Sequence, residues 1–217
     1  MMLEKIFPKL HQEGHKFLAI SAVVTLILWL ISDFFGFIFI LITIWVYYFF
    51  RDPERKIIED NTYLVSPADG IISAIAEVNG PVELGLENKK FTRVSIFMNI
   101  FDCHVNRSPS SGEIQDIFYK PGKFLNASLD KASEENERNY FKIKDNKTDN
   151  PIVVVQIAGL IARRIVTQVE KTQTVSQGQR LGMIRFGSRV DIYYSQRKTM
   201  VKVGQNVIAG ESLIASS

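Results

Sequence analysis

The stretch RLGMIRFGSRVDIYY, residues 180–194, has the pattern of a β-strand that a Gly-Ser pair interrupts. β-Branched and aromatic residues on either side predict strands at 183–186 and 190–194. Because a glycine packs poorly inside a strand, Gly187 and Ser188 taken alone indicate a bulge or a turn between these two strands.

Working outward, the same pattern of short alternating runs, punctuated by Gly, Pro and Asn, extends back to Leu64. We therefore expect a mainly β domain, with helix only around 127–138, where the polarity equally favours a solvated loop. The predicted strands are 70–78, 93–99, 112–119, 140–144, 152–158, 165–169, 183–186, 190–194 and 213–215.

Two segments near the end of the chain echo each other: VSQGQRLGMI at 175–184 and VKVGQNVIAG at 201–210. Each has a Gly-Gln turn between β-branched runs, and the pair resembles the compact barrel-sandwich of lipoyl and biotinyl carrier domains. We do not expect carrier function, because such domains display a modifiable Lys at a hairpin tip. The turn here has Gly187, Ser188 and Arg189 instead.

The N-terminal third contains an apolar segment, 17–50, whose only charged residue is Asp33. One helix of this length would extend about 50 Å, beyond a hydrocarbon core of about 30 Å. Ser32, Asp33 and Gly36 supply turn chemistry near the midpoint, so we expect a membrane-associated helical hairpin in 1–56, ahead of a catalytic domain in 57–217. Lys and Arg flank both ends, which predicts that both face the cytoplasm. The alternative is a buried hairpin of a soluble protein.

Composition narrows the functional classes. The chain has 217 residues, 46% of them hydrophobic, and a formal net charge of +3. This length allows one catalytic domain of β-sandwich or barrel-like form after the anchor, and no run of Lys and Arg suggests nucleic acid. Cys103 is the only cysteine, which excludes an intramolecular disulfide and a cysteine-based zinc site.

Several separated motifs match one family in the same order. SPADG (66–70), FDCHVNRSP (101–109) and KPGKFLNASLDKASEENERN (120–139), together with FGS at 186–188, resemble the phosphatidylserine decarboxylase proenzyme family in its short form of about 220 residues. The resemblance extends from HQEGHKF (11–17) and FFRDPERK (49–56) to GQNVIAGESLIA (204–215).

This resemblance implies that the chain cuts itself between Gly187 and Ser188, giving a large β chain (1–187) and a small α chain (188–217) that form a heterodimer, with further oligomerisation open. Ser188 becomes a covalent pyruvoyl group, which forms a Schiff base with phosphatidylserine and accepts electrons as CO2 leaves and phosphatidylethanolamine forms. It implies no metal and no pyridoxal phosphate. The implied location is the cell membrane, with the catalytic domain on the cytoplasmic face.

The residues fit this chemistry. Gly187 lacks a Cβ and leaves its carbonyl open to the Ser188 hydroxyl. Deprotonating that hydroxyl needs a base active near neutral pH, and His104 is the only histidine outside the N-terminal tail. Asp69 matches the family's partner for this base, although Pro-Ala-Asp-Gly is also ordinary turn chemistry.

Other roles near the site are less defined. In an extended segment Cys103 and His104 face opposite sides, which makes Asp102 and Asn106 the better supporting residues. Some longer family members have a second histidine three positions on, where this chain has Arg107. His104 then serves both self-cleavage and decarboxylation, or water or Arg107 takes one role.

The lipid phosphate needs hydrogen-bond donors. Arg163 and Arg164 in GLIARRIV, and Arg138 in ENER, are candidates, and a solvated surface position is the alternative for each. Two other functions remain open for the chain as a whole. One is a membrane esterase with an uncleaved Ser188-His104-Asp69 triad, although Ser188 lacks the G-x-S-x-G elbow; the other is a non-catalytic membrane-anchored adaptor.

Overall fold

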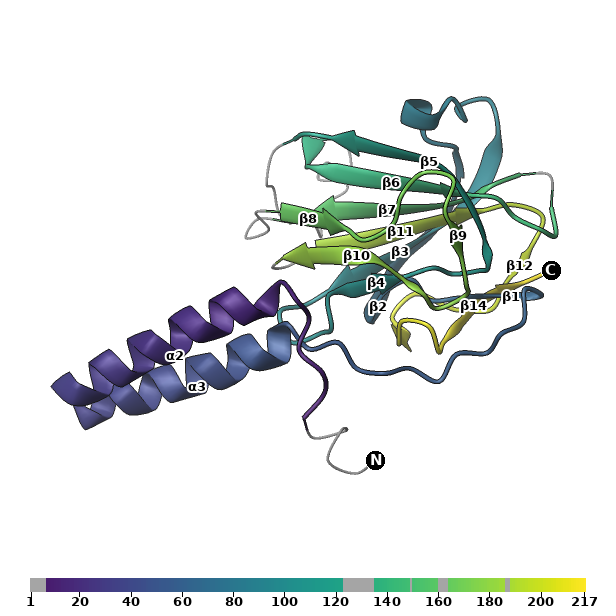
Figure 1. Cartoon of the computed structure of the whole chain (residues 1–217). Helices are drawn as coiled ribbons and strands as arrows, with labels where there is room; N and C mark the ends of the chain where they lie inside the picture. The colour runs from purple at the N-terminus through teal and green to yellow at the C-terminus, as the bar shows by residue number, and fades with distance from the viewer. Residues whose placement is uncertain (1–6, 123–134, 149, 160–163, 186–187) are drawn as a thin grey trace. The chain divides into compact units, whose positions relative to one another are not determined.

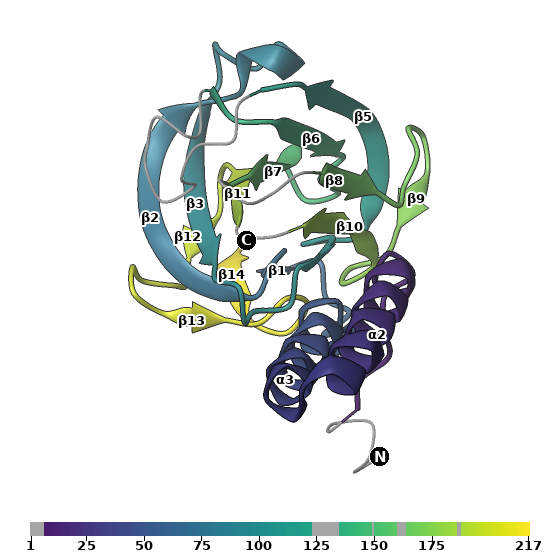
Figure 2. The same ribbon diagram turned by 90° about the vertical axis from the view of Figure 1, so that its left-hand side faces the viewer.

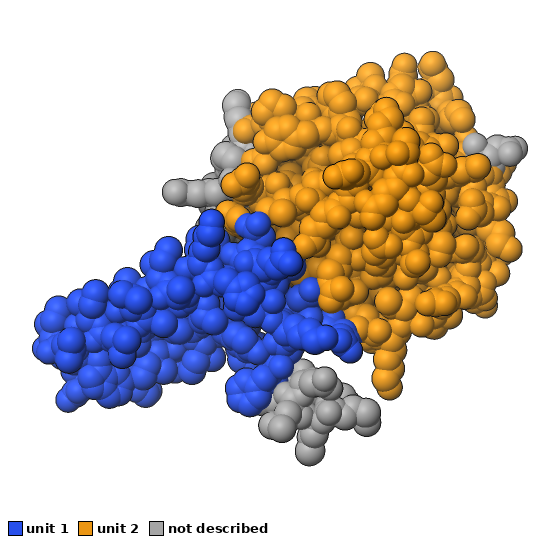
Figure 3. Space-filling model, viewed as in Figure 1, with its two compact units in different colours: residues 1–54 blue, residues 55–217 orange. Residues whose placement is uncertain are grey.

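The computed structural model describes residues 7–122, 135–148, 150–159, 164–185 and 188–217. The chain forms two compact units, residues 1–54 and residues 55–217, which Figure 3 colours separately.

The first unit contains two apolar helices, α2 (Gly14–Ile31) and α3 (Asp33–Phe49). Ser32 between them is extended, with φ −163°, and this single residue turns the chain back on itself. Hydroxyl groups hold the helices together: the Thr43 Oγ1 lies 2.6 Å from the Ser21 Oγ and 2.9 Å from the Thr25 Oγ1. The predicted helical hairpin is therefore confirmed.

Large apolar side chains cover the outside of this hairpin. Leu30 is 88% exposed, Phe34 68% and Leu26 67%. Among the described helices, α2 alone is long and apolar enough to cross a membrane, with a mean hydropathy of 1.9, while α3 is shorter. A water-soluble surface seldom exposes so many apolar side chains in one region, which is consistent with membrane association.

The second unit is built from strands and one short 3-10 helix, η1 (Val82–Leu84). The strands are β1 (Tyr63–Val65), β2 (Gly70–Asn79), β3 (Lys90–Met98), β4 (Val105–Arg107), β5 (Gly112–Lys120), β6 (Arg138–Ile143), β7 (Ile152–Ala158), β8 (Arg164–Thr167), β9 (Thr174–Val175), β10 (Arg180–Arg185), β11 (Ser188–Tyr194), β12 (Lys198–Thr199), β13 (Asn206–Val207) and β14 (Leu213–Ser216).

These strands form one large curled sheet and two small ones. The large sheet has the order β13-β2-β3-β11-β7-β6-β5-β9, and the small sheets are β1-β14-β12 and β4-β10-β8. Figure 1 shows the large sheet from the side, and in Figure 2 it curls so that β2 and β5 lie on opposite sides. The strands β1, β14 and β10 lie across the remaining side, so the unit is a half-barrel.

The two faces of the large sheet carry different clusters. Along β11, Val190 and Ile192 point into the main core, where they pack with their neighbours Ile96 and Val154 on β3 and β7. Tyr193 belongs to a second cluster on the outer face. The outer cluster consists of Leu84, Leu86, Phe91, Tyr140, Val153, Val155 and Ile157. The alternation of β11 therefore separates an inner, site-bearing face from an outer face.

The predicted mainly β fold is confirmed, with local differences. Ser188 is the first residue of β11 rather than part of a turn. Of the segment 127–138, in which we expected helix or loop, residues 127–134 lie outside the described residues, and Arg138 begins β6. The strands β1, β4, β9, β12 and β13 were not predicted; they have two or three residues each, too few to show a period.

The echo between 175–184 and 201–210 corresponds to a repeated turn. Gly178 and Gly204 both have positive φ, +75° and +86°. In each turn the next residue is a glutamine whose side-chain carbonyl accepts a backbone N–H three residues back: Ser176 donates to Gln179 at 3.0 Å and Lys202 to Gln205 at 3.2 Å. The repeated Gly-Gln pair is thus a device for a tight turn with its own side-chain cap.

Candidate active site

Ser188 lies in the middle of the large sheet. It is fully buried, and it is paired with Met98 on β3 and with Ala158 on β7. Its hydroxyl oxygen is buried and has no hydrogen-bond partner among the described residues, a condition it shares with Ser95 and Ser110. A buried hydroxyl without a partner costs free energy, so these positions call for an explanation. Gly187, and with it the predicted bond to be cut, lies outside the described residues.

His104 is fully buried immediately before β4. Its ring Nδ1 is 3.0 Å from the main-chain carbonyl oxygen of Asp102. Because a carbonyl oxygen only accepts, Nδ1 carries the hydrogen, and in the neutral ring Nε2 then has the free electron pair. The imidazole is therefore fixed in the form that can take a proton at Nε2. We expected Asp102 to support His104, and the supporting atom is its main-chain oxygen.

Backbone pairing brings His104 and Ser188 to the same end of the half-barrel. The His104 carbonyl accepts a hydrogen bond from the Ile184 N–H of β10 at 3.3 Å, four residues before Ser188. From the other side, the Asn106 Nδ2 lies 3.6 Å from the sulfur of Met98, the residue opposite Ser188. Strands β10 and β3 thus connect both residues, although they are 84 positions apart in the sequence.

Asp69 makes hydrogen bonds to groups other than His104. Its carboxylate accepts two bonds from the Arg55 guanidinium, at 2.7 and 2.9 Å, and one from the Ala209 N–H at 2.8 Å. Gly70 follows with φ +144°, where a Cβ would collide with the Phe97 carbonyl oxygen. The SPADG segment is therefore a tight turn that only glycine can close against β3, and it holds Asp69 in a fixed position.

The ion pair with Asp69 is partly shielded from water, with side chains 12% and 13% exposed. Burial opposes the charge of Arg55, but the carboxylates of Asp69 and Glu211 and the negative form of Cys103 together outweigh it. The pKa of the Arg55 guanidinium is consequently raised above its ordinary value.

A chain of buried amide groups crosses the inner face beside Ser188, and sequence reasoning found only one of its members, Asn106. The Gln156 Nε2 donates to the Asn106 Oδ1 at 2.8 Å. The Asn139 Nδ2 lies 3.3 Å from the Gln156 Oε1 and 3.1 Å from the Thr167 Oγ1. Gln156 is the one polar residue of IVVVQIA in β7, and this polar exception within a buried run was the available signal.

The three arginines predicted for phosphate binding do not form one group. Arg163 lies outside the described residues. Arg138 is on the outer face, opposite Ile157, with its guanidinium 5.7 Å from the Tyr140 ring centre and 3.7 Å from the Glu83 carboxylate. Arg164 begins β8, is exposed, and is paired with Arg185, three residues before Ser188.

Neither Arg107 nor Cys103 belongs to the chain of buried amide groups beside Ser188. The Arg107 guanidinium donates to the Gly178 carbonyl at 3.0 Å, and the side chain is buried. Cys103 is a buried thiol. In the part of the chain that the structure describes, no group of three or more His, Cys, Asp and Glu residues could hold a metal ion.

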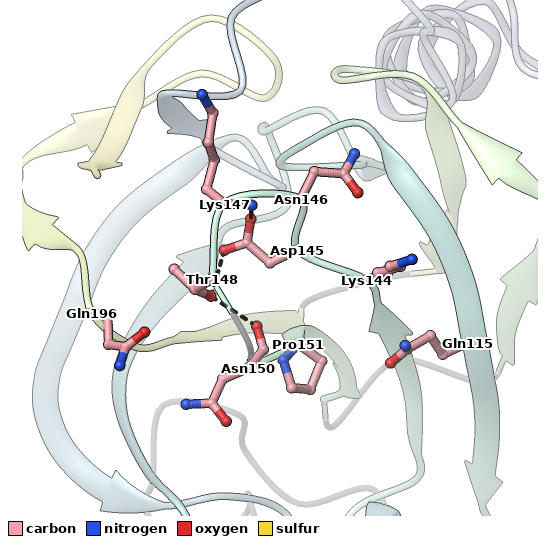
Figure 4. Close-up of a pocket in the computed structure, with 9 residues that line it drawn as sticks. All are labelled: Gln115, Lys144, Asp145, Asn146, Lys147, Thr148, Asn150, Pro151 and Gln196. Carbon is pink, nitrogen blue, oxygen red and sulfur yellow. Dashed lines mark hydrogen bonds between the residues drawn. The ribbon is translucent and has the colours of Figure 1, made fainter.

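A cavity of about 610 Å³ in the second unit is remote from Ser188. It lies around the β6–β7 turn, and Figure 4 shows the residues that line it. This turn adjoins Ile152 at the start of β7, whereas Ser188 is opposite Ala158 at the other end of the strand. Asp145 organises this turn through bonds to Thr148 and Arg197, both within 3.0 Å. The lining residues are Gln115, Lys144, Asp145, Asn146, Lys147, Thr148, Asn150, Pro151 and Gln196.

Comparison with known proteins identifies the family. The family model described as phosphatidylserine decarboxylase matches residues 42–215. The chain belongs to the phosphatidylserine decarboxylase family. It is 64% identical over 214 residues to the phosphatidylserine decarboxylase proenzyme of Pelagibacter ubique (strain HTCC1062), covering 99% of both chains. It is 49% identical over 215 residues to the proenzyme of Ruegeria pomeroyi, covering 99% of this chain and 98% of the relative.

The resemblance drawn from the motifs is thus confirmed, and the matched region contains Asp69, His104 and Ser188. Members of the family are proenzymes by name, which directs attention to the buried hydroxyl of Ser188. A pyruvoyl group formed from residue 188 would carry its ketone on the former Cα, in the buried position paired with Met98 and Ala158. The residues present therefore fit a pyruvoyl group at this position.

Proposed function

We propose that this chain is a membrane-associated phosphatidylserine decarboxylase, which releases CO2 from phosphatidylserine and leaves phosphatidylethanolamine. The observation that supports it most is the buried, unpartnered Ser188 hydroxyl at the start of β11, together with a buried imidazole at the same end of the half-barrel, whose Nδ1 is held by the Asp102 carbonyl. Family membership selects this function over a membrane esterase or an adaptor.

Maturation begins with the chain's own residues. The His104 Nε2 takes the proton of the Ser188 hydroxyl, and the oxygen attacks the Gly187 carbonyl carbon, forming an ester as the peptide C–N bond breaks and the Ser188 nitrogen takes up a proton. Loss of the Cα proton then breaks the ester Cβ–O bond and frees the carboxylate of Gly187. Hydrolysis of the remaining dehydroalanine releases ammonia and leaves a pyruvoyl group on chain 188–217, paired with chain 1–187.

A pyruvoyl group supplies an electron sink for decarboxylation when it is present. His104 has the tautomer needed to accept a proton at Nε2 and return it to the product carbon, so one residue serves both stages. Asp69 supports the base electrostatically, in a position fixed by Arg55. Burial of the substrate carboxylate beside residue 188 would remove it from water and favour loss of its charge as CO2.

Arg164 is the better supported of the phosphate donors. It is paired directly with Arg185, and burial lowers the pKa of the Arg185 guanidinium. A phosphate between these two guanidinium groups would accept charge-assisted hydrogen bonds from both. Arg138, on the outer face, contributes to the Glu83 network instead.

Two apolar helices and a lipid substrate favour a location at the cell membrane with the catalytic domain on the cytoplasmic face. This orientation follows from the basic residues at both ends of the apolar segment.

Mass spectrometry of the purified full-length chain tests the proposal. Wild-type protein should give two masses, 1–187 and a 188–217 fragment that begins with pyruvate, and should release CO2 from phosphatidylserine. Ser188→Ala should stay intact and inactive, whereas Ser95→Ala, which removes another buried and unpartnered hydroxyl, should be cut normally.

His104→Gln should slow self-cleavage about 10²- to 10⁴-fold, the usual contribution of a general base, while the exposed His15→Gln should not. An active wild-type sample with one intact mass would refute the pyruvoyl mechanism. Labelling of intact protein by a serine-reactive phosphonate would point to the esterase instead.

A further inference from the structure

The turn between β3 and β4 exposes two neighbouring apolar side chains beside the active site. Ile100 is 38% exposed and Phe101 68% exposed. We call these two residues the apolar tip. The tip carries no charge, and the polar residues Asn99 and Asp102 stand on either side of it.

Three hydrogen bonds fix the shape of this turn. The Asp102 N–H donates to the Asn99 carbonyl at 3.1 Å, and the Asn99 N–H donates to the Asp102 carboxylate at 2.8 Å. The Phe101 N–H donates to the Asn99 side-chain oxygen at 2.7 Å. The polar groups of the turn are thus satisfied internally, so the apolar tip is held outward in one arrangement.

The same residue that closes the turn also orients the imidazole. The Asp102 carboxylate caps Asn99, while its main-chain oxygen accepts the Nδ1 hydrogen of His104. Phe101 and His104 are three residues apart, so their Cα atoms are separated by at most about 11 Å. This distance is shorter than a lipid molecule, so one lipid could contact the tip and reach His104 at the same time.

Exposed apolar side chains also occur on the neighbouring strand β2 and just after the edge strand β13. Ile71, 41% exposed, is directly opposite Phe97, two residues before Asn99. Ile208, 43% exposed, follows Val207, which pairs with Gly70. A single exposed apolar side chain is ordinary, but a fixed apolar turn next to a buried catalytic histidine is a candidate contact surface.

We propose that the apolar tip enters the acyl-chain region of the bilayer and contacts the hydrocarbon chains of the lipid whose headgroup reaches Ser188 and His104. This inference rests on the proposed function. A phospholipid has its charged headgroup and its acyl chains at opposite ends. A site that takes the headgroup into a buried pocket therefore needs apolar contact for the chains immediately outside it. Ile100 and Phe101 meet that requirement, because the Cα atom of Phe101 lies at most about 11 Å from that of His104.

The test compares two forms of the substrate. Full-length wild-type protein and the double variant Ile100→Ser/Phe101→Ser are reconstituted and assayed for CO2 release. One substrate is long-chain phosphatidylserine in phosphatidylcholine vesicles, and the other is short-chain phosphatidylserine dissolved as monomers. We expect the ratio of kcat/KM on vesicles to kcat/KM on monomers to fall roughly tenfold or more, since each lost apolar side chain removes about that factor in affinity.

The matched control is Val82→Ser/Val203→Ser, which removes two apolar side chains that are 66% and 59% exposed elsewhere on the unit. This control should keep the wild-type ratio. Phe101→Trp should also keep it, because an indole ring enters the membrane interface well. Self-cleavage, read as appearance of the 188–217 fragment, checks that the tip variant folds and retains an active His104.

An unchanged ratio in the tip variant would overturn the inference. An equal loss on both substrates would overturn it too, because the tip would then act on the catalytic residues rather than on the lipid. A change in oligomeric state with no change in the ratio would assign the surface to a second copy. Failure of wild-type protein to release CO2 from either substrate would refute the proposed function itself, a separate result.

Discussion

Replacing Asp69 with Asn separates two roles that the sequence and the structure assign to this carboxylate. In the structure Asp69 accepts two hydrogen bonds from Arg55, at 2.7 and 2.9 Å, and one from Ala209. An asparagine can keep the bond to the Ala209 N–H, but it loses the charge that attracts the guanidinium. A hydrogen bond to a charged group contributes about 1.5–3 kcal/mol to stability.

The side chains of Arg55 and Asp69 are 12% and 13% exposed, so partial screening by water favours the lower part of this range. We expect Asp69→Asn to reduce the free energy of unfolding by about 2 kcal/mol, which corresponds to a fall in melting temperature of roughly 4–8 °C for a domain of this size. Arg55→Met should cost a similar amount. The double variant should cost less than the sum, with a coupling energy of about 1–2 kcal/mol.

The stability measurements use the Ser188→Ala background, in which self-cleavage cannot interfere, and follow urea unfolding of the detergent-solubilised chain. Self-cleavage is measured separately with Ser188 intact, from the rate at which the 188–217 fragment appears. If Asp69 supports the base directly, Asp69→Asn slows cleavage about 10²-fold or more, and Arg55→Met slows it much less.

Equal slowing by Asp69→Asn and Arg55→Met would show that Asp69 acts only by holding Arg55, and would refute its role as partner of the base. A coupling energy near zero would refute the argument from the ion pair. The two conclusions rest on different measurements, so each can fail alone.

Three further predictions concern the packing around the site. Gln156→Leu should reduce the free energy of unfolding by about 2–4 kcal/mol, because Asn106 and Asn139 lose a buried partner, and urea unfolding at wild-type stability would contradict this. Gly70→Ala should lower the melting temperature more than Gly85→Ala does: both glycines have positive φ, but only at Gly70 would the new methyl group collide with backbone. Burial raises the pKa of Tyr193 to about 12, so the neutral phenol favours the folded state. That contribution is complete below pH 10 and is lost as the pH rises through 12; the urea midpoint should fall over this window in wild type and less in Tyr193→Phe.

Local patterns predicted the parts of this protein that depend on local physics. The apolar stretch around Asp33 predicted the two helices. Alternation of apolar and polar residues predicted the longer strands, because burial on one face of a sheet imposes a period of two. Ser188 was expected in a turn, since Gly187 argued for one. In the structure β3 and β7 pair with residue 188 from both sides and extend β11 to that residue.

The partners within the site could not be predicted, because they are distant in sequence. Nothing around Asp69 in the sequence indicates Arg55 or Ala209, and the motif suggested His104 instead. We expected the Asp102 side chain to support His104, but its main-chain oxygen does so. Because every residue has a main-chain carbonyl, the sequence cannot predict which one accepts such a bond. The sequence shows Gln156 as the one polar residue in an apolar strand. Only the structure shows that it hydrogen-bonds Asn106 and Asn139.

The position of β11 has a consequence for the lifetime of the processed molecule. Residues 188–217 supply a central strand of the large sheet, an edge strand of that sheet through β13, and β14 between β1 and β12. Cutting the chain before Ser188 would thus free one end without freeing the peptide, which remains interleaved among strands of the longer piece. The main core is built from residues of both pieces, such as Ile96 and Val154 of the longer and Val190 and Ile192 of the shorter, so separating them would expose it to water. Because the cleaved peptide bond cannot be re-formed, an enzyme whose two pieces had dissociated would not recover. Its active lifetime would then be set by the rate at which the pieces separate.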